Sequence, residues 1–524
     1  MPNRTTLSPE PVVILENTFQ NPFDNAVATA RTCYSSKVIH AADVAATEQT
    51  KVRRDAIAQS TYQAGHHTTI QHATFQFVLD KVSRQMIWSF LHSHPFYNSE
   101  QVSQRYVEMK SENFTTPALK EENVPLYRQA IEELMAAYHQ LAALLEPTVI
   151  AEYQRLFRAR NLEEKRWKSA IKKRCQEVAR YVLPVATHAH LYHTVSGLTL
   201  HRYHRLCQQF DVPLEQKIVV QKMVDAVNAS DPDFFKFIED PLPLEQTFEY
   251  QLLSQWSEDV KRAWPEAFIR EFDRDLDGYS SKLVDYKANA EPVLAQSVRS
   301  VLGMPAAALS DDDAIDQVMN PAKNPYFSES LNLTSMGKLT RTLVHPHFTF
   351  KKKISHTADS QDQRHRMTPA SRPVLIRQVR WDQPDYIVPV LVQANPEALA
   401  FFQAAMKKIW QRMETLKASG ESDENVSYLL PNAFPIRFEE SGDLLNFHHK
   451  WTHRLCYTAQ EEIWKTSQDE VLQLQKTFPR LGKYFGAPCW MRKQAGVKPF
   501  CPEGDRFCGV TVWTLPISEY RRLI

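Results

Sequence analysis

Two long amphipathic helices are predicted from the spacing of apolar residues in distant parts of the chain. Between Leu126 and Leu145, apolar side chains recur every three or four residues, which is the period of a helix with one buried face. A second run of this kind extends from Asn395 to about Gly420. Asparagine favours the N-cap, Pro396 suits the first helical position and glycine suits the exit, so both ends of this helix are marked.

A short strand-like stretch precedes each predicted long helix. His72 to Phe77 and His345 to Phe350 both begin with histidine and place phenylalanine at the same two offsets. Apolar residues that alternate with polar ones are typical of a half-buried strand. After each helix come a Leu-Pro pair and then Arg-Leu-Cys, at Arg205 and again at Arg454. The shared order predicts an internal duplication.

The duplication sets the expected domain organisation. We expect a first half over residues 1–235, a partly helical connector over 236–320, and a second half over 321–524 that ends in a cysteine-containing tail. Each half is expected to be a sheet with long helices. The predicted fold class is therefore α+β, with the two related halves packed as a pseudo-dimer.

The charge balance excludes some classes of partner. The chain has 62 basic and 61 acidic residues, for a formal net charge of +1, so no overall field draws it to nucleic acid or to an acidic membrane. Only 12 residues are glycine, and neither a Rossmann nor a P-loop fingerprint is present. An anionic ligand must therefore be bound by local arginines.

The expected compartment is the cytoplasm. The N-terminus has no basic segment followed by an apolar run, and no stretch is long and apolar enough for a transmembrane helix. Seven cysteines are an odd and sparse number for 524 residues, which favours free thiols in a reducing compartment.

The first half resembles the flavin-dependent thymidylate synthase family. The run from Asn98 to Tyr106 is similar to the family signature that ends in Ser-x-Arg-Tyr: Ser103 and Arg105 fit directly, and Gln101 takes a position that is Glu or Gln in the family. His72 fits the histidine of the strand entry. Glu177 to Pro184, which contains Arg180, is similar to Glu-x-Ala-Arg-x-x-Leu-Pro. One element is missing, because the Arg-His-Arg expected at residues 92–94 reads His-Ser-His.

The second half resembles the complementary part of the family pattern. Gln361, Arg364, His365 and Arg366 form Gln-x-x-Arg-His-Arg, with His345 at the strand entry. Residues 453–463, which include Arg454, are similar to the late Leu-Arg and Ala-Gln-x-Glu-Ile segment. This half lacks Ser-x-Arg-Tyr and has serine at position 427 in place of the arginine before Leu-Pro. The complementary losses predict one composite site to which both halves contribute.

The resemblance implies a reaction, cofactors and residue roles. The reaction is methylation of dUMP to dTMP with methylenetetrahydrofolate, NADPH and FAD, without a cysteine nucleophile. Arg454 is the expected catalytic residue, which stabilises negative charge that develops on the uracil ring. The expected substrate-binding residues are Gln101, Ser103, Arg105, Arg180, Gln361 and Arg364. His72, His345, Arg364, His365 and Arg366 are expected to bind FAD. Because the family is tetrameric, a homodimer of this double-length chain is expected.

The same residue types suit a nucleotide on physical grounds. Arginine forks match phosphate oxygens in pairs, and a glutamine amide offers both a donor and an acceptor to a uracil edge. Taken alone, the segment from Arg364 to Arg366 is typical of a solvated basic turn. The segment from Ser103 to Tyr106, taken alone, is typical of a capped helix start. The order that both motifs share with the family favours a site.

Three alternative functions stay open at this stage. The first is a non-catalytic or regulatory nucleotide-binding relative, and the second is an enzyme that transfers a one-carbon unit to another pyrimidine nucleotide. The third is a metal-dependent enzyme built on the histidines of residues 188–204 and on the cluster of cysteines near the C-terminus. No metal site is assigned. Cys489, Cys501 and Cys508 lie close in sequence, but zinc needs a fourth ligand, so a packed thiol cluster is expected. The other cysteines, Cys33, Cys175, Cys207 and Cys456, are expected to be small core residues.

Overall fold

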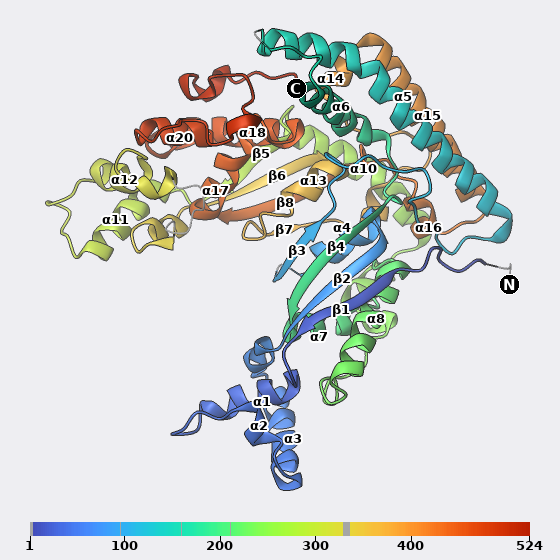
Figure 1. Ribbon diagram of the computed structural model, residues 1–524, viewed down its shortest axis with the longest axis vertical. Helices are drawn as coiled ribbons and strands as arrows, with labels where there is room; N and C mark the ends of the chain where they lie inside the picture. Colours follow the sequence, from blue (N-terminus) through green and yellow to red (C-terminus); the bar gives the residue numbers. More distant parts are fainter. Residues whose placement is uncertain (1–3, 95, 159, 210, 329–335) are drawn as a thin grey trace. The chain divides into compact units, whose positions relative to one another are not determined.

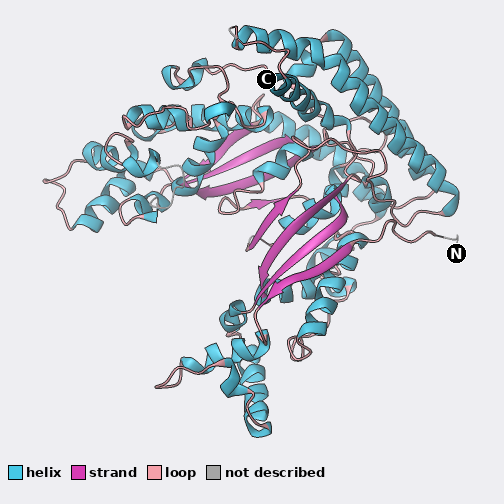
Figure 2. Cartoon of the chain, viewed as in Figure 1, coloured by secondary structure: helices cyan, strands magenta, loops and turns pink. Residues whose placement is uncertain are grey.

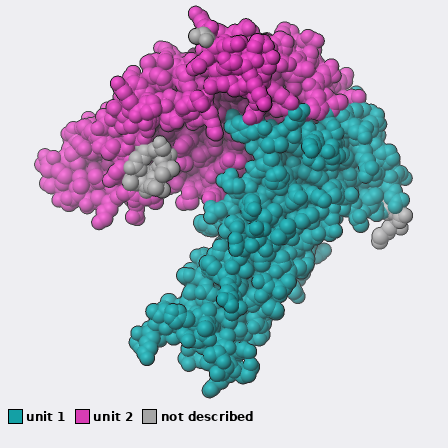
Figure 3. Space-filling view, viewed as in Figure 1, with its two compact units in different colours: residues 1–135, 183–262, 411–430 teal, residues 136–182, 263–410, 431–524 magenta. Residues whose placement is uncertain are grey.

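The computed structural model describes residues 4–94, 96–158, 160–209, 211–328 and 336–524, and the chain forms two compact units (Figure 3). The first unit contains residues 1–135, 183–262 and 411–430, and the second contains residues 136–182, 263–410 and 431–524. Each unit therefore includes a segment from the opposite half of the sequence. Three of the five changeovers fall inside helices, namely α5 (Val124–Leu156), α10 (Glu258–Leu276) and α15 (Pro396–Ala418). The other two follow Val182 and Leu430.

Both long helices predicted from apolar spacing are confirmed as α5 and α15. The Asn395 side chain accepts a hydrogen bond from the Ala398 N–H at 3.0 Å, as an N-cap does. At the exit, Gly420 has a φ of 82°, a left-handed conformation that costs glycine no steric strain.

The first unit contains a four-stranded antiparallel sheet in the order β1-β2-β4-β3 (Figure 1). Its strands are β1 (Val12–Thr18), β2 (Thr74–Ser83), β4 (His188–Ser196) and β3 (Tyr97–Gln101). On β2, Phe75, Phe77 and Leu79 are fully buried and alternate with partly exposed residues. They share an apolar core with α4 (Arg84–His92), α7 (Gly197–Leu206) and α8 (Leu214–Ser230).

The second unit repeats this order as β5-β6-β8-β7, and Figure 2 shows the strands of both sheets in magenta. The strands are β5 (Ser281–Tyr286), β6 (His347–Ser355), β8 (Pro435–Asp443) and β7 (Ala370–Ser371). The helices that correspond to α4, α7 and α8 are α13 (His356–Asp362), α17 (Leu444–Arg454) and α18 (Glu461–Thr477). The predicted α+β fold with two related halves is confirmed, and β5 lies inside the stretch expected as a connector.

Each of the remaining α-helices belongs to one of the two units. Those of the first unit are α1 (Pro22–Thr32), α2 (Ala41–Val44), α3 (Glu48–Gln63), α9 (Phe248–Leu253) and α16 (Asp423–Ser427). Those of the second unit are α6 (Lys165–Ala179), α11 (Ala290–Leu302), α12 (Asp311–Met319), α14 (Val390–Gln393), α19 (Pro479–Gly482) and α20 (Pro488–Gln494).

A buried glutamate anchors the helix that follows the central strand of the first sheet. Ser83 ends β2 and caps α4 by accepting the Met86 N–H at 3.0 Å. The Ser83 N–H and hydroxyl donate to the Glu215 carboxyl group at 2.7 and 2.5 Å, and the Tyr428 hydroxyl donates to it at 3.0 Å. Burial raises the pKa of Glu215 to about 7 in spite of these donors.

The second unit contains the same arrangement. The Ser355 N–H and hydroxyl donate to Glu462 at 2.6 and 2.5 Å, and the Tyr181 hydroxyl donates to it at 2.5 Å. Here too burial raises the pKa of the glutamate. Because Tyr181 belongs to the first half of the sequence, the exchanged segment completes an anchor of the second unit.

Candidate active site

The family-like motifs of the second half meet at the ends of two helices in the second unit. Arg454 is the last residue of α17, and Gln361 lies in the last turn of α13. The Arg454 Nε donates to Nε2 of His365 at 3.0 Å, and its Nη2 donates to the Gln361 carbonyl at 3.3 Å. These two hydrogen bonds join Arg454 to residues that lie 89 and 93 positions earlier in the sequence.

His365 is held in its neutral form. Burial lowers its pKa well below the usual range, and the positive charges of Arg454 and Lys450 lower it further. A neutral imidazole accepts the hydrogen bond from Arg454 without neutralising the guanidinium. The His365 imidazole and the Gln361 carbonyl therefore orient the Arg454 guanidinium.

Gln361 presents an unsatisfied donor. Its side chain is buried, and among the described residues its Nε2 has no hydrogen-bond partner. An unpaired buried N–H costs about 1–3 kcal/mol, so such a group is typical of a binding site. Arg364 and His345 are exposed, and within the described part of the chain their side chains make no hydrogen bond. Arg366 is half-buried.

A buried ionic network lies beside this turn. Lys352 Nζ lies 3.0 Å from Asp362, 2.8 Å from Glu440 and 3.1 Å from Glu470. Lys450 Nζ lies 2.7 Å from Asp362 and 2.5 Å from Glu440. All five side chains are at most 1% exposed. Asp362 follows Gln361 directly, so the network fixes the end of α13 that carries the motif.

The same positions in the first unit are apolar or aromatic. Counted from the helix N-caps and the strand pairing, Lys352, Asp362, Glu440 and Lys450 correspond to Leu79, Phe90, His193 and Tyr203. The ring centroids of Phe90 lie 4.8 Å from His193 and 4.6 Å from Tyr203. Among these corresponding positions, those of the second unit carry buried charges, whereas those of the first unit do not carry an ion pair network.

The two Arg-Leu-Cys segments, at Arg205 and Arg454, do not occupy equivalent positions relative to the starts of α7 and α17. Counted from the N-caps Ser196 and Asp443, the position of Arg454 corresponds to Cys207, not to Arg205. Arg205 donates from Nη1 to the Asp240 carbonyl, and its Nε lies 3.8 Å from Glu239. The sequence match is therefore not a structural equivalence, because the three residues lie two positions earlier relative to the helix start.

The family-like residues of the first half are divided between the two units. Gln101 ends β3, and its Oε1 accepts from Arg84 Nη1 at 2.9 Å. The Ser103 hydroxyl accepts the Arg105 N–H at 3.2 Å, and the Arg105 guanidinium lies 5.4 Å from the Tyr106 ring centroid. His72 is exposed.

Arg180 belongs to the second unit, together with Gln361 and Arg454. It is 4% exposed, and its carbonyl accepts from Asn432 Nδ2 at 3.0 Å. Its positive charge also lowers the pKa of Glu462, against the larger effect of burial. The sequence places Arg180 in the first half, so only the fold brings it into the unit of the second-half motif.

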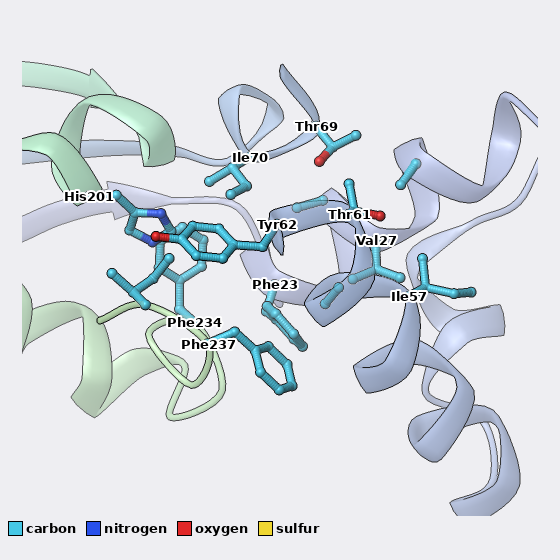
Figure 4. A pocket seen from close by; sticks show the side chains of 14 residues that line it. Phe23, Val27, Ile57, Thr61, Tyr62, Thr69, Ile70, His201, Phe234 and Phe237 are labelled. Atoms are coloured by element: carbon cyan, nitrogen blue, oxygen red, sulfur yellow. The ribbon is translucent and has the colours of Figure 1, made fainter. Parts of the chain in front are cut away.

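The histidines considered as metal ligands have other environments. Within the described ranges, no group of three or more His, Cys, Asp or Glu side chains is arranged to hold a metal ion. His201 instead lines an apolar pocket of the first unit with about 490 Å³ of empty space, between Tyr62, Ile70 and Phe234 (Figure 4). Sequence reasoning did not find this pocket, because its walls come from α1, α3, the short 3₁₀ helix His67–His72, α7 and the segment after α8.

Comparisons with known proteins agree with the motifs. The profile of a family described as "Thymidylate synthase complementing protein" matches residues 14–233 and 282–480. A flavin-dependent thymidylate synthase of Clostridium tetani is 27% identical over an alignment of 252 residues that covers 44% of this chain and 94% of that protein. Enzymes of the same name from Saccharolobus solfataricus and Nitratidesulfovibrio vulgaris are 26% and 29% identical, over 40% and 32% of this chain and 78% and 69% of theirs.

One solved structure is also similar, the UMP/dUMP methylase PolB from Streptomyces cacaoi bound with 5-Br dUMP. It is 15% identical, with 44% of this chain and 94% of that chain covered, but its TM-score of 0.31 is too low to support a conclusion. In the part of the chain that is described, none of the helices has the length and apolar character needed to cross a membrane.

Proposed function

Because this chain belongs to the family described as "Thymidylate synthase complementing protein", we propose that it methylates dUMP to dTMP with FAD, methylenetetrahydrofolate and NADPH. The names of its relatives, flavin-dependent thymidylate synthases, support this reaction. The observation that carries the proposal is the pair of hydrogen bonds from Arg454 to His365 and Gln361, which joins two motifs of the family.

Arg454 is the proposed catalytic residue. Methylation at carbon 5 of uracil requires that carbon to act as a nucleophile, and the proton on carbon 5 is lost in the reaction. Negative charge that develops on the uracil ring makes carbon 5 more nucleophilic. The Arg454 guanidinium, which His365 and the Gln361 carbonyl orient, stabilises that negative charge. Such preorganised donors typically contribute a factor of about 10²–10³ to the rate.

The nucleotide is bound by residues from both halves of the sequence. The buried Nε2 of Gln361 supplies a donor for a uracil carbonyl. Arg105, Arg180 and Arg364, with the Ser103 hydroxyl and Gln101, pair with the phosphate and the sugar. Since the whole chain carries a net charge of only +1, convergent arginines must provide the affinity for a phosphate dianion.

The Arg-His-Arg turn fits the phosphates of FAD. Arg364 is exposed with no side-chain hydrogen bond in the described part of the chain, so its donors are available to a pyrophosphate. Arg366, His365, His72 and His345 are the other residues that would hold the cofactor. When bound, the flavin supplies reducing equivalents, while the residues of this chain bind, orient and stabilise charge.

The visible absorption spectrum before and after addition of dUMP tests this proposal. A flavin spectrum that dUMP perturbs, together with release of tritium from the 5 position of labelled dUMP, is the expected result. A protein that takes up no FAD, or one that binds both ligands and releases no tritium, would contradict it. UMP in the same assay checks the choice of nucleotide.

A further inference from the structure

Four cysteines of the second unit line one small cavity. Cys456 follows α17, Cys489 lies in α20, and Cys501 and Cys508 lie in the segment after α20. The empty volume of the whole cavity, which includes space open to solvent, is about 360 Å³. The sequence identified three of these thiols and expected Cys456 in the core, so the fold supplies the fourth.

The four thiols are close enough to influence one another. Burial, and to a smaller extent the neighbouring Cys456, Cys501 and Cys508, raise the pKa of Cys489 to about 12. The pKa of Cys508 is raised to about 11, again by burial first and then with contributions from Cys456 and Cys501. All four are free thiols, so none is used in a disulfide. The other cysteines lie elsewhere: Cys175 and Cys207 are buried as expected, whereas Cys33 is exposed, contrary to expectation.

The cavity is otherwise mostly apolar, with few polar groups. Tyr457, Phe507, Val512 and Trp513 contribute to its walls. Thr458 Oγ1 lies 3.1 Å from the Cys456 sulfur, and among the residues that line the cavity only Glu503 carries a carboxylate. Four thiols in an apolar, partly closed space match the ligand set of an iron–sulfur cluster, which is held by cysteine thiolates alone.

A single zinc ion fits the arrangement less well. Zinc holds sulfur at about 2.3 Å, so four cysteines around it must converge on one point. In the ranges that the structure describes, no three such ligands converge in this way. A cluster with several irons would distribute the four thiolates over more than one iron, so they would not have to converge on one point.

We propose that Cys456, Cys489, Cys501 and Cys508 bind an iron–sulfur cluster that fixes the C-terminal segment to the end of α17. Cys456 lies two residues after Arg454, so the cluster holds the segment that carries the proposed catalytic arginine. Three of the ligands lie beyond residue 480, where the family match ends. The site is independent of the proposed function, since it can be occupied in a chain that does not methylate dUMP.

Metal analysis of the full chain, purified without oxygen, tests the site. We expect iron and acid-labile sulfide in equal amounts, about two or four of each per chain. Dithionite should give an electron paramagnetic resonance signal of a reduced cluster, which separates the cluster from flavin absorbance. One zinc per chain without sulfide would overturn the proposal, as would no metal after reconstitution with iron and sulfide.

Cysteine variants locate the ligands. Cys501→Ser and Cys508→Ser, at half-exposed positions, should each lose more than about half of the bound iron. Cys33→Ser, which changes an exposed thiol of the first unit, should keep the wild-type amount. Circular dichroism checks that the variants fold. Wild-type iron content in both ligand variants would exclude these cysteines, and the wild-type metal analysis decides the question if the variants fail to fold.

Discussion

At the residue scale, the hydrogen-bond acceptors of Arg454 decide how its guanidinium is oriented. It donates to a neutral histidine and to a backbone carbonyl, whereas Arg205, its match in the sequence, donates to the Asp240 carbonyl and lies near the Glu239 carboxylate. A guanidinium beside a carboxylate has much of its charge compensated. Two arginines in similar sequences thus have different hydrogen-bond partners.

Arg454→Ala should therefore remove most of the activity. We expect the rate of tritium release from labelled dUMP to fall by roughly 10²–10³, the usual effect of removing one preorganised donor to a developing anion. Arg205→Ala is the matched control and should change the rate by less than about threefold, since Arg205 is occupied in its own unit. Equal losses in the two variants would show that the offset of the Arg-Leu-Cys match has no functional meaning.

At the element scale, a buried glutamate holds the start of the helix that follows β2 in the first sheet and β6 in the second, namely α4 and α13. Ser83 and Ser355 cap these helices and also donate to a buried glutamate from the first turn of α8 or α18. This contact fixes the start of α13, and the ionic network around Asp362 fixes its end. The Arg-His-Arg turn follows a helix that is held at both ends.

The Glu215 anchor predicts a pH-dependent stability. Its pKa is raised to about 7 in the folded protein, so its contribution is fully present below the unfolded pKa of about 4.5 and is lost as the pH rises through 7. The loss corresponds to roughly 3 kcal/mol. Relative to the wild type, Glu215→Gln should gain this amount in unfolding free energy between pH 4.5 and 8. Denaturant curves at several pH values measure the difference, and a constant difference would rule out the effect.

The ionic network predicts a large cost for removing one charge. Lys450→Met leaves Asp362 and Glu440 partly uncompensated in a fully buried site, so the unfolding free energy should fall by about 3–5 kcal/mol. Lys465→Met removes a surface lysine that lies 2.5 Å from Asp469, and it should cost about 1 kcal/mol or less. Urea denaturation compares the two. A small loss for Lys450→Met would mean that the carboxylates are neutralised in another way.

At the scale of the whole molecule, the compact units are not the two halves of the sequence. Residues 136–182 belong to the second unit and residues 411–430 to the first. The exchange places Arg180 and Tyr181 with the second-half motifs, and Tyr428 with Glu215. The halves expected at residues 1–235 and 321–524 remain predictions from sequence, but each unit needs a segment that the other half encodes.

The proposed division of the nucleotide site between the halves predicts that neither is sufficient. Arg105→Ala and Arg454→Ala should each lower dUMP-dependent turnover by at least about 100-fold, because each removes a different contact to one bound nucleotide. Arg128→Ala, an exposed arginine of α5, serves as the control and should keep the wild-type rate. If either active-site variant retained about half of the activity, two independent sites would be the better explanation.

By itself, the sequence determined the features that depend on neighbouring residues: the periods of α5 and α15, the caps of α15, the strands after His72 and His345, and the family-like motifs. The tertiary structure decided which distant residues meet. It joined Arg454 to Gln361, moved Arg180 into the second unit, showed the offset of Arg205, and added Cys456 to three other thiols. Periodicity and capping act over a few residues, whereas these contacts span tens to hundreds of residues and depend on how the strands and helices are connected.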